Sequence, residues 1–524
     1  MSISFMPPPR DSIRHELAKQ KIDQQFLLWL TLPTSQNLLE KLIDESKSQN
    51  FLSIHPSPIF TDRLSSSFNQ SASLGRRSSL TPPLPPVSMD RTSDSLRPTI
   101  IADTQHQLRA SISISQTQST PGIPQFYFAK GKPLESEILE SNQRTFNTLF
   151  HKDSLKLNEF EQVCVKLCGL PKFLASRLMS VVGGDEYVTK SIFWKFWKSH
   201  FEAIGIVERF FMIAKKPNCK YIDRNDFKPI LRVLMDSHPG LDFLKATPEF
   251  QDRYADTVIE RIFYMVDKND DGKITLRELK RSNLVDICLT LDEEEDINKI
   301  RDYFSYEHFY VLYCRFWEID TDHDFIIDKE DFSRYEGHTL SRKANDRIFD
   351  QVPRRFSCQI PGKMSYEDFI WFMISEEDKT SYQSLDYWFK IVDLDNNGII
   401  APHEMEFFYE EQLRRLEYLN QEAVPFKDVL CQMADMLNPK VENKFTIEDF
   451  YGKKTISGVF FNALLNLNKF IAYEQRDPFS IKKEINENPD FSEWDRFALV
   501  EYVRLAMEEE NADNNEVLED EWDN

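Results

Sequence analysis

The sequence predicts an all-α protein in which paired helix–loop–helix units form an elongated array. From residue 121 onward, apolar residues recur at helical spacing and almost no strand-like alternation occurs. The sequence of helix, short polar loop and helix then repeats along the chain. The aromatic content is 13%, with 41 phenylalanines, and large rings supply the buried area that small helical units need. These three observations together favour a repeated helical architecture.

Residues 1–50 predict a short amphipathic helical segment. Pro33 separates two helices, and Thr34 is placed to cap the second. A pair of helices this short buries too little surface to be stable alone, so we expect a docking element or a small satellite bundle. The apolar positions at helical spacing are Ile22, Phe26, Trp29, Leu30, Leu38, Leu39, Leu42 and Ile43.

Residues 51–120 are rich in Ser, Thr and Pro and poor in aromatic residues. Such a composition cannot offset the entropy lost on ordering, so we predict a disordered linker. Within it, the run Arg76-Arg77-Ser78-Ser79 is typical of a basophilic kinase substrate. The run 82–86, PPLPP, is typical of polyproline II, although both short patterns also arise by chance.

The dense part of the chain contains eight helix–loop–helix units, which we expect to form four pairs. Each unit exposes an apolar face that its neighbour covers, and the eighth residue of each loop is placed to form a small antiparallel bridge. We assign residues 121–250 and 251–455 to two domains of such units, 456–508 to a C-terminal helical segment and 509–524 to an acidic disordered tail. The units lie at 145–165, 177–198, 206–233, 257–284, 310–337, 344–374, 384–411 and 427–453.

Composition narrows the class of function. The net charge of −22 argues against a nucleic-acid partner and favours cations or basic protein surfaces. The sequence shows no secretory leader and no membrane span, so we expect a cytoplasmic protein, with a cytoskeletal association or a nuclear location as alternatives. Seven scattered cysteines indicate reduced, buried thiols. No phosphate-binding, nucleophile-elbow, zinc-protease or kinase motif occurs, so we predict that the chain is not an enzyme.

The stretch DKNDDGKITLRE, residues 267–278, meets every requirement of a calcium-binding EF-hand loop. Its side chains supply oxygen at positions 1, 3, 5, 9 and 12, its backbone carbonyl at position 7, and its glycine, Gly272, stands at position 6. Calcium takes about seven oxygens, and the turn at position 6 requires positive φ. A solvated acidic turn is the alternative. The predicted ligands are Asp267, Asn269, Asp271, Lys273 (carbonyl), Thr275 and Glu278.

The stretch DLDNNGIIAPHE, residues 393–404, is the second candidate. Gly398 takes position 6, and Ala401 at position 9 leaves that place to a water molecule. Pro402 suits the first turn of the exiting helix, where no backbone donor is required. The predicted ligands are Asp393, Asp395, Asn397, Ile399 (carbonyl) and Glu404.

The stretch DTDHDFIIDKED, residues 320–331, departs from the pattern twice. Phe325 replaces glycine, which costs about 1–2 kcal/mol if the residue takes positive φ. Asp331 replaces glutamate and is one methylene too short to offer both oxygens readily. The concentration of carboxylates favours a divalent ion nonetheless, and we predict Ca²⁺ with Mg²⁺ also possible here. The predicted ligands are Asp320, Asp322, Asp324, Ile326 (carbonyl), Asp328 and Asp331.

Two further units, with loops at 214–227 and 438–450, keep the apolar scaffold but lack the carboxylates, so we expect structural partners. The Trp-rich helix FWKFWKSHF, residues 193–201, is either part of the core or a stripe for a partner, and its spacing favours the core.

Several longer stretches resemble one family, the B'' (B double-prime) regulatory subunits of protein phosphatase 2A, of the plant-like subtype. The likeness runs from about residue 121 to 508, and the early stretch FLLWLTLPTSQNLLEKLI (26–43) looks like the N-terminal part of plant-type members. The stretches that carry it are IPQFYFAKGKP (123–133), the run from Asp292 to Tyr335, GKMSYEDFIWFMISEEDK (362–379), the run from Asp386 to Arg415, and the segment 476–502 with RDPFSIKKE and SEWDRFALVEY.

The resemblance implies a non-catalytic subunit that binds the scaffold (A) and catalytic (C) subunits, directs the phosphatase to phosphoprotein substrates and responds to calcium. In the family, the two calcium loops match 320–331 and 393–404, and related members have a ligand-poor loop where this chain has 267–278. We nonetheless predict three sites, because the spacing at 267–278 is complete. The alternative is a phosphatase-independent EF-hand calcium-binding adaptor or cytoskeletal scaffold.

Overall fold

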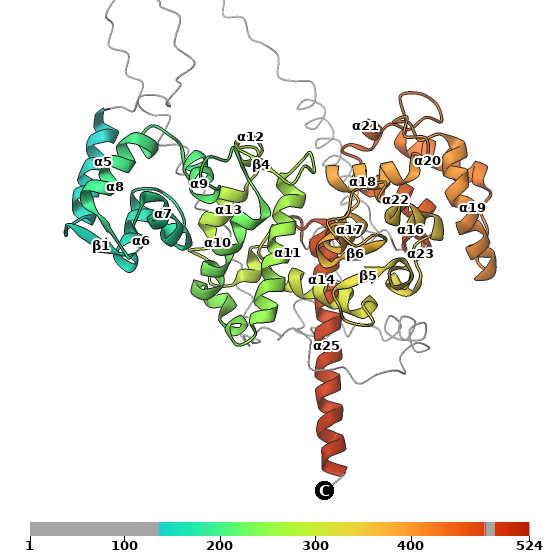
Figure 1. Cartoon of the computed structure of the whole chain (residues 1–524). Helices are drawn as coiled ribbons and strands as arrows, with labels where there is room; N and C mark the ends of the chain where they lie inside the picture. The colour runs from blue at the N-terminus through green and yellow to red at the C-terminus, as the bar shows by residue number, and fades with distance from the viewer. Residues whose placement is uncertain (1–135, 185, 476, 478–487, 523–524) are drawn as a thin grey trace, which may run out of the picture. The chain divides into compact units, whose positions relative to one another are not determined.

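The computed structural model describes residues 136–522, apart from residues 185, 476 and 478–487 (Figure 1). The described residues belong to one compact unit, Thr81–Asn524. The helices and linker predicted for residues 1–120 lie outside the described residues. No helix among the described residues is long and apolar enough to cross a membrane.

The first two units pair through a short antiparallel ladder. In this ladder Leu155 faces Val188, and both side chains are buried. The elements in order are α5 (Ser136–Leu149), β1 (Ser154–Lys156), α6 (Leu157–Lys166), η1 (Lys172–Leu174), α7 (Ala175–Val182), β2 (Tyr187–Thr189), α8 (Lys190–Phe196) and η2 (Trp197–Phe201).

The third and fourth units pair in the same way, with Ile222 opposite Ile274. The exiting helix of the fourth unit, α12, is only one turn long and is followed by a bend into α13. The elements are α9 (Ile206–Ala214), β3 (Tyr221–Ile222), α10 (Arg224–Ser237), η3 (Pro239–Ala246), α11 (Pro248–Val266), β4 (Ile274–Thr275), α12 (Leu276–Leu279) and α13 (Leu284–Thr290).

The fifth and sixth units pair through Ile327 and Met364. Asp328 caps α15 by accepting hydrogen bonds from the backbone N–H groups of Glu330 and Asp331, so the exiting helix begins directly after position 9 of the loop 320–331. The elements are η4 (Ile297–Lys299), α14 (Tyr306–Ile319), β5 (Ile326–Asp328), α15 (Lys329–Ser333), η5 (Tyr335–Gly337), α16 (Arg342–Phe349), β6 (Lys363–Ser365) and α17 (Tyr366–Glu377).

The seventh and eighth units pair through a single bridge between Ile400 and Phe445. The four pairs expected from the sequence are therefore present, and the eighth loop residues Ile274, Ile327 and Ile400 form the bridges as predicted. The elements are α18 (Tyr382–Val392), α19 (Pro402–Tyr418), α20 (Phe426–Leu437), α21 (Ile447–Phe450), α22 (Lys454–Leu465) and α23 (Leu467–Glu474).

A long helix, α25 (Glu493–Trp522), ends the described chain and runs beside α14 (Figure 1). The structure here corrects the prediction of a disordered tail over 509–524, because α25 continues to Trp522. Extending an existing helix avoids the cost of nucleating a new one, which explains why an acidic sequence remains helical.

The aromatic stripe at 193–201 belongs to the core, as its spacing predicted. Phe193, Trp197 and Phe201 are fully buried, and Arg209 lies over the ring of Trp197 at 4.8 Å.

All seven cysteines are free thiols. Burial raises the pKa of the Cys168 thiol to about 12, so this residue is an inert core group.

Candidate metal-binding loops and the charged network beside them

The three acidic loops share one backbone geometry. In each, the carboxylate at position 1 accepts a hydrogen bond from the N–H at position 6, and the oxygen at position 5 accepts one from the N–H at position 7. The position-6 bonds run from Gly272 to Asp267 at 2.8 Å, from Phe325 to Asp320 at 2.9 Å and from Gly398 to Asp393 at 2.8 Å. The sequence pattern therefore fixes the turn of the loop, whichever residue stands at position 6.

In the loop 320–331 the side chains of Asp320, Asp322 and Asp324 converge, with one oxygen of each within 4.8 Å of the others. One oxygen of Asp320, Oδ1, is buried and has no hydrogen-bond partner among the described residues. Burial, with smaller contributions from Asp322 and Asp324, raises the pKa of Asp320 to about 6. A buried, unpartnered carboxylate oxygen facing two other carboxylates fits a hard divalent cation.

Asp331, at position 12, stays outside this convergent group. Its carboxylate accepts a hydrogen bond from the N–H of Asp328 at 3.2 Å and pairs with Arg334 at 3.3 Å. Asp328 itself pairs with Lys363 at 3.4 Å. The shorter side chain of aspartate at position 12 therefore leaves the converging oxygens to positions 1, 3 and 5.

Phe325 takes the positive φ that position 6 of a calcium-binding loop requires, +64°. Its ring stacks on Phe316, with centroids 6.2 Å apart, and the guanidinium group of Arg253 lies 4.4 Å from the ring centroid. Such aromatic and cation–π contacts are worth about 0.5–2 kcal/mol each. They offset the backbone strain of a bulky residue in the left-handed region.

In the loop 393–404 the converging side chains are those of Asp393, Asp395 and Glu404. Glu404 is fully buried, and its Oε1 accepts a hydrogen bond from the N–H of Leu394 at 2.6 Å. The side-chain amide of Asn397 donates to Asp395 at 2.8 Å. The glutamate at position 12 thus reaches back to the start of its loop, as a bidentate calcium ligand must.

The loop 267–278 keeps the same turn but does not bring its carboxylates together within the same distance. Glu278 Oε1 accepts a hydrogen bond from the side-chain amide of Asn269 at 2.9 Å, and Oε2 accepts from Thr275. Asp270 pairs with Arg354 at 3.1 Å. The best match in sequence is therefore the least convergent in the structure.

The two ligand-poor loops serve as structural partners. Asp223 caps α10 by accepting from the N–H of Asp226, and Asp449 accepts from the N–H of Thr446 at 2.8 Å. Their acidic residues are used in capping boxes that begin helices.

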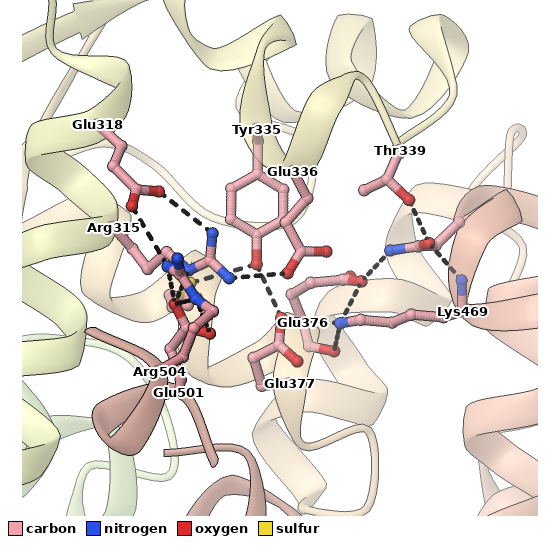
Figure 2. A network of polar contacts seen from close by, with 12 residues as sticks. Arg315, Glu318, Tyr335, Glu336, Thr339, Glu376, Glu377, Lys469, Glu501 and Arg504 are labelled. Carbon is pink, nitrogen blue, oxygen red and sulfur yellow. Dashed lines mark hydrogen bonds and ion pairs between the residues drawn. The ribbon is translucent and has the colours of Figure 1, made fainter. Parts of the chain in front are cut away.

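A buried charged network lies beside the third and fourth pairs and was not predicted from the sequence (Figure 2). Glu376 of α17 is 1% exposed and bonds to Lys379 at 2.7 Å, to Lys469 of α23 at 2.9 Å and to the Asn466 amide at 2.7 Å. Burial lowers the pKa of Lys379 to about 8, although Glu376 opposes that shift. No local motif marks these residues, because they lie up to 93 positions apart.

The network continues from the exit of the loop 320–331 to α25. Tyr335, in η5, donates a hydrogen bond to Glu377 at 2.8 Å. Arg315 of α14 pairs with Glu501 of α25 at 2.9 Å and with Glu336 at 3.7 Å, as Figure 2 shows. Charges from four helices thus hold the exit of this loop in place.

The chain is similar to known proteins over nearly its whole length. An EF-hand domain model matches residues 206–294. A probable B''delta regulatory subunit of serine/threonine protein phosphatase 2A from Arabidopsis thaliana is 44% identical over 97% of this chain and 94% of its own length. The chain belongs to the B'' regulatory subunits of protein phosphatase 2A.

Two other relatives of this B'' subunit either have a lower sequence identity to it or match a smaller part of it. The human B'' subunit beta is 36% identical over 96% of this chain and 90% of its own length. A solved chain from a PP2A PR70 holoenzyme is 46% identical and covers 51% of this chain and 98% of that chain, with a TM-score of 0.48. The Arabidopsis thaliana relatives confirm the family and the plant-like subtype inferred from the sequence.

The EF-hand match of this B'' regulatory subunit covers the second pair, including the loop 267–278. The convergent carboxylates instead lie in the third and fourth pairs. Family membership therefore establishes a regulatory subunit with EF-hand units, and the choice of metal loops depends on the geometry of each loop.

Proposed function

We propose that this chain is a non-catalytic, calcium-responsive subunit that binds the scaffold (A) and catalytic (C) subunits of protein phosphatase 2A and directs the enzyme to phosphoprotein substrates. The observation that carries the proposal is the alignment with a B'' subunit over 97% of the chain. We further propose a cytoplasmic location, which the reduced cysteines favour.

We propose Ca²⁺ as the ion, because the converging groups are oxygens and Ca²⁺ takes 6–8 of them. The ligands in the loops 320–331 and 393–404 would be those named from the sequence. Mg²⁺ is an alternative at 320–331, where the carboxylate of Asp331 lies outside the convergent group of Asp320, Asp322 and Asp324. Binding at 267–278 would require Glu278 to leave the amide of Asn269. At a free ion concentration of about ten times Kd, each bound ion stabilises the loop geometry that it favours by about 1.4 kcal/mol.

Affinity purification of the tagged full chain, with calcium and with a chelator, tests partner and ion together. We expect the scaffold and catalytic subunits to co-purify in stoichiometric amounts, and the amount recovered to change when calcium is removed. Recovery of neither subunit would instead favour the phosphatase-independent adaptor. Equal recovery in both conditions would remove the calcium response while keeping the subunit role.

A double substitution tests the contribution of the loop 393–404. Asp393→Ala with Glu404→Ala removes two converging carboxylates and should weaken assembly. The matched control is Asp435→Ala with Glu442→Ala, which removes two exposed acids of the same pair and should leave assembly unchanged. Unchanged assembly in both variants would exclude this loop as a switch.

A further inference from the structure

A cavity of about 800 Å³ opens beside the loop 267–278 in the second pair. The end of α11, the loop itself, α12 and the segment before α13 contribute to its lining, together with the buried Tyr303. Its volume lies within the range of about 300–1,000 Å³ that is typical of ligand pockets. The cavity therefore has room for a bound chemical group and for part of the molecule that carries it.

Three cationic side chains line this cavity: Lys268, Arg277 and Arg281. In the described part of the chain, none of the three side chains forms an ion pair or a hydrogen bond. The chain has 86 acidic residues against 64 basic ones, so partners for cations are abundant. The cavity therefore carries three cationic side chains that no carboxylate of the described residues neutralises.

Neighbouring cations in the same pair show the contrast. Lys280, which does not line the cavity, pairs with Glu208. Arg224 binds Glu260 through two bonds of 2.6 and 2.9 Å. Lys280 and Arg224 are thus neutralised within the protein, whereas Lys268, Arg277 and Arg281 are left for another group.

The remaining lining residues fit an anion carried on a peptide. Glu278 is the one carboxylate among the described lining residues, and both of its oxygens already accept hydrogen bonds within the loop. Ser282 and Asn283 add polar groups, while Met265 adds apolar surface. A cavity that is lined by charges of one sign and has low-dielectric walls concentrates the positive potential inside it.

We propose that this cavity binds a phosphoryl group on a serine or threonine of a partner protein. Arginine presents a planar fork of N–H donors that matches phosphate oxygens in pairs. A phosphoserine carries about −1.5 to −2 charges at neutral pH, whereas a carboxylate carries one. Three cations therefore match a phosphoserine better than they match a carboxylate. The apolar and polar walls would contact the flanking peptide.

This inference rests in part on the proposed function, because a subunit that directs a phosphatase needs a means of holding phosphoproteins. The cavity lies beside the loop 267–278 and apart from the two convergent carboxylate groups. Phosphopeptide binding here would add a docking contact that does not depend on those two loops.

The test uses the purified full chain and fluorescent peptides. A pool of short peptides with a central phosphoserine and degenerate flanks is compared with the same pool carrying serine or glutamate, and sodium phosphate serves as a competitor. Fluorescence anisotropy should show the phosphoserine pool binding about ten-fold or more tightly than the other two pools. The double variant Arg277→Gln with Arg281→Gln should lose about ten-fold in phosphopeptide affinity.

The matched control is Arg342→Gln with Arg355→Gln, which alters two exposed arginines away from the cavity. It should retain phosphopeptide affinity within about two-fold. Circular dichroism checks that both double variants are folded. Equal affinity of the cavity variant and the control would overturn the proposal.

Other outcomes also decide the question. Equal binding of the phosphoserine and glutamate pools, or binding of inorganic phosphate with no preference for the phosphopeptide, would reject a phosphopeptide site. If the cavity variant loses the scaffold and catalytic subunits but keeps phosphopeptide affinity, the cavity is a subunit interface and the proposal fails. Phosphopeptide binding by a chain that does not co-purify with the phosphatase would support the site and reject the proposed function.

Discussion

The loops 267–278 and 320–331 rank in opposite orders by sequence and by structure. The first meets every position of the calcium pattern, yet its carboxylates do not converge. The second has phenylalanine in place of glycine and aspartate in place of glutamate, yet three of its carboxylates converge. The pattern therefore describes the turn of the loop well and the gathering of its oxygens poorly.

The two loops differ in convergence because the side chains at positions 3 and 12 make different contacts. In 267–278 the amide of Asn269 donates to Glu278, which satisfies that carboxylate without an ion. In 320–331 position 3 is Asp322, which has no proton to donate when ionised, and Asp320 keeps a buried oxygen without a partner. A hydrogen bond between the side chains at positions 3 and 12 thus competes with metal in the loop 267–278, and Asp322 cannot donate such a bond in the loop 320–331.

The surroundings of the two loops differ as well. The exit of 320–331 is held by buried charges that reach α17, α23 and α25 (Figure 2). The loop 267–278 lies beside a cavity with unpaired cations. Four substitutions test whether these surroundings and ligands matter.

The largest effect is expected from Lys469→Met. This change removes the partner of Glu376 at 2.9 Å and of Glu377 at 2.8 Å, and leaves buried carboxylates with less compensation. Breaking a buried ion pair in this way costs about 3 kcal/mol or more. Chemical denaturation should show that loss, whereas Lys427→Met, on an exposed position of α20, should change little. Equal stability of the two variants would show that the network does not hold the loop exit.

Glu336→Gln should remove a pH dependence of stability. Burial and the nearby Glu377 raise the pKa of Glu336 from about 4.5 to about 7, against the opposing charges of Lys469 and Arg315, with a smaller contribution from Glu376. The folded protein then binds this proton more tightly than the unfolded chain does. The free energy of unfolding should therefore fall by about 1–3 kcal/mol as pH rises from 4.5 to 7.

Denaturation at pH 5 and pH 8 measures this change. The difference between the two pH values should be smaller in Glu336→Gln than in the parent, and unaltered in Glu330→Gln, which changes an exposed acid on α15. A parent protein whose stability rises through this interval by the same amount as the variant would contradict the assignment.

Asp331→Glu should strengthen calcium binding by the loop 320–331. The added methylene allows both oxygens at position 12 to reach the ion, so we expect about ten-fold higher Ca²⁺ affinity and a lower relative affinity for Mg²⁺. Isothermal titration with each ion measures both effects. Glu330→Asp, which changes the neighbouring non-ligand acid, should leave the titration as it was. No gain in affinity would mean that length at position 12 is not what limits this loop.

Asn269→Asp is expected to have the smallest effect. It removes the amide donor to Glu278 and adds a carboxylate, so the loop 267–278 should bind Ca²⁺ about three-fold more tightly. Titration of the parent and variant also counts the occupied loops, with Asn218→Asp in the ligand-poor loop as a control. A parent that already binds three ions with similar affinity would remove the contrast between the two loops.

The sequence alone determined the helical units, their pairing through the eighth loop residues, the positive φ of Phe325 and the family, because these depend on local spacing and on long matched segments. It did not determine which carboxylates converge, because that depends on whether Asn269 or a neighbouring backbone group takes up the position-12 oxygens. Nor did it reveal the network of Glu376 and Lys469, whose residues come together only when separate pairs pack. Backbone turns follow from neighbours in the chain, whereas the partner of a buried charge is set by contacts between distant segments.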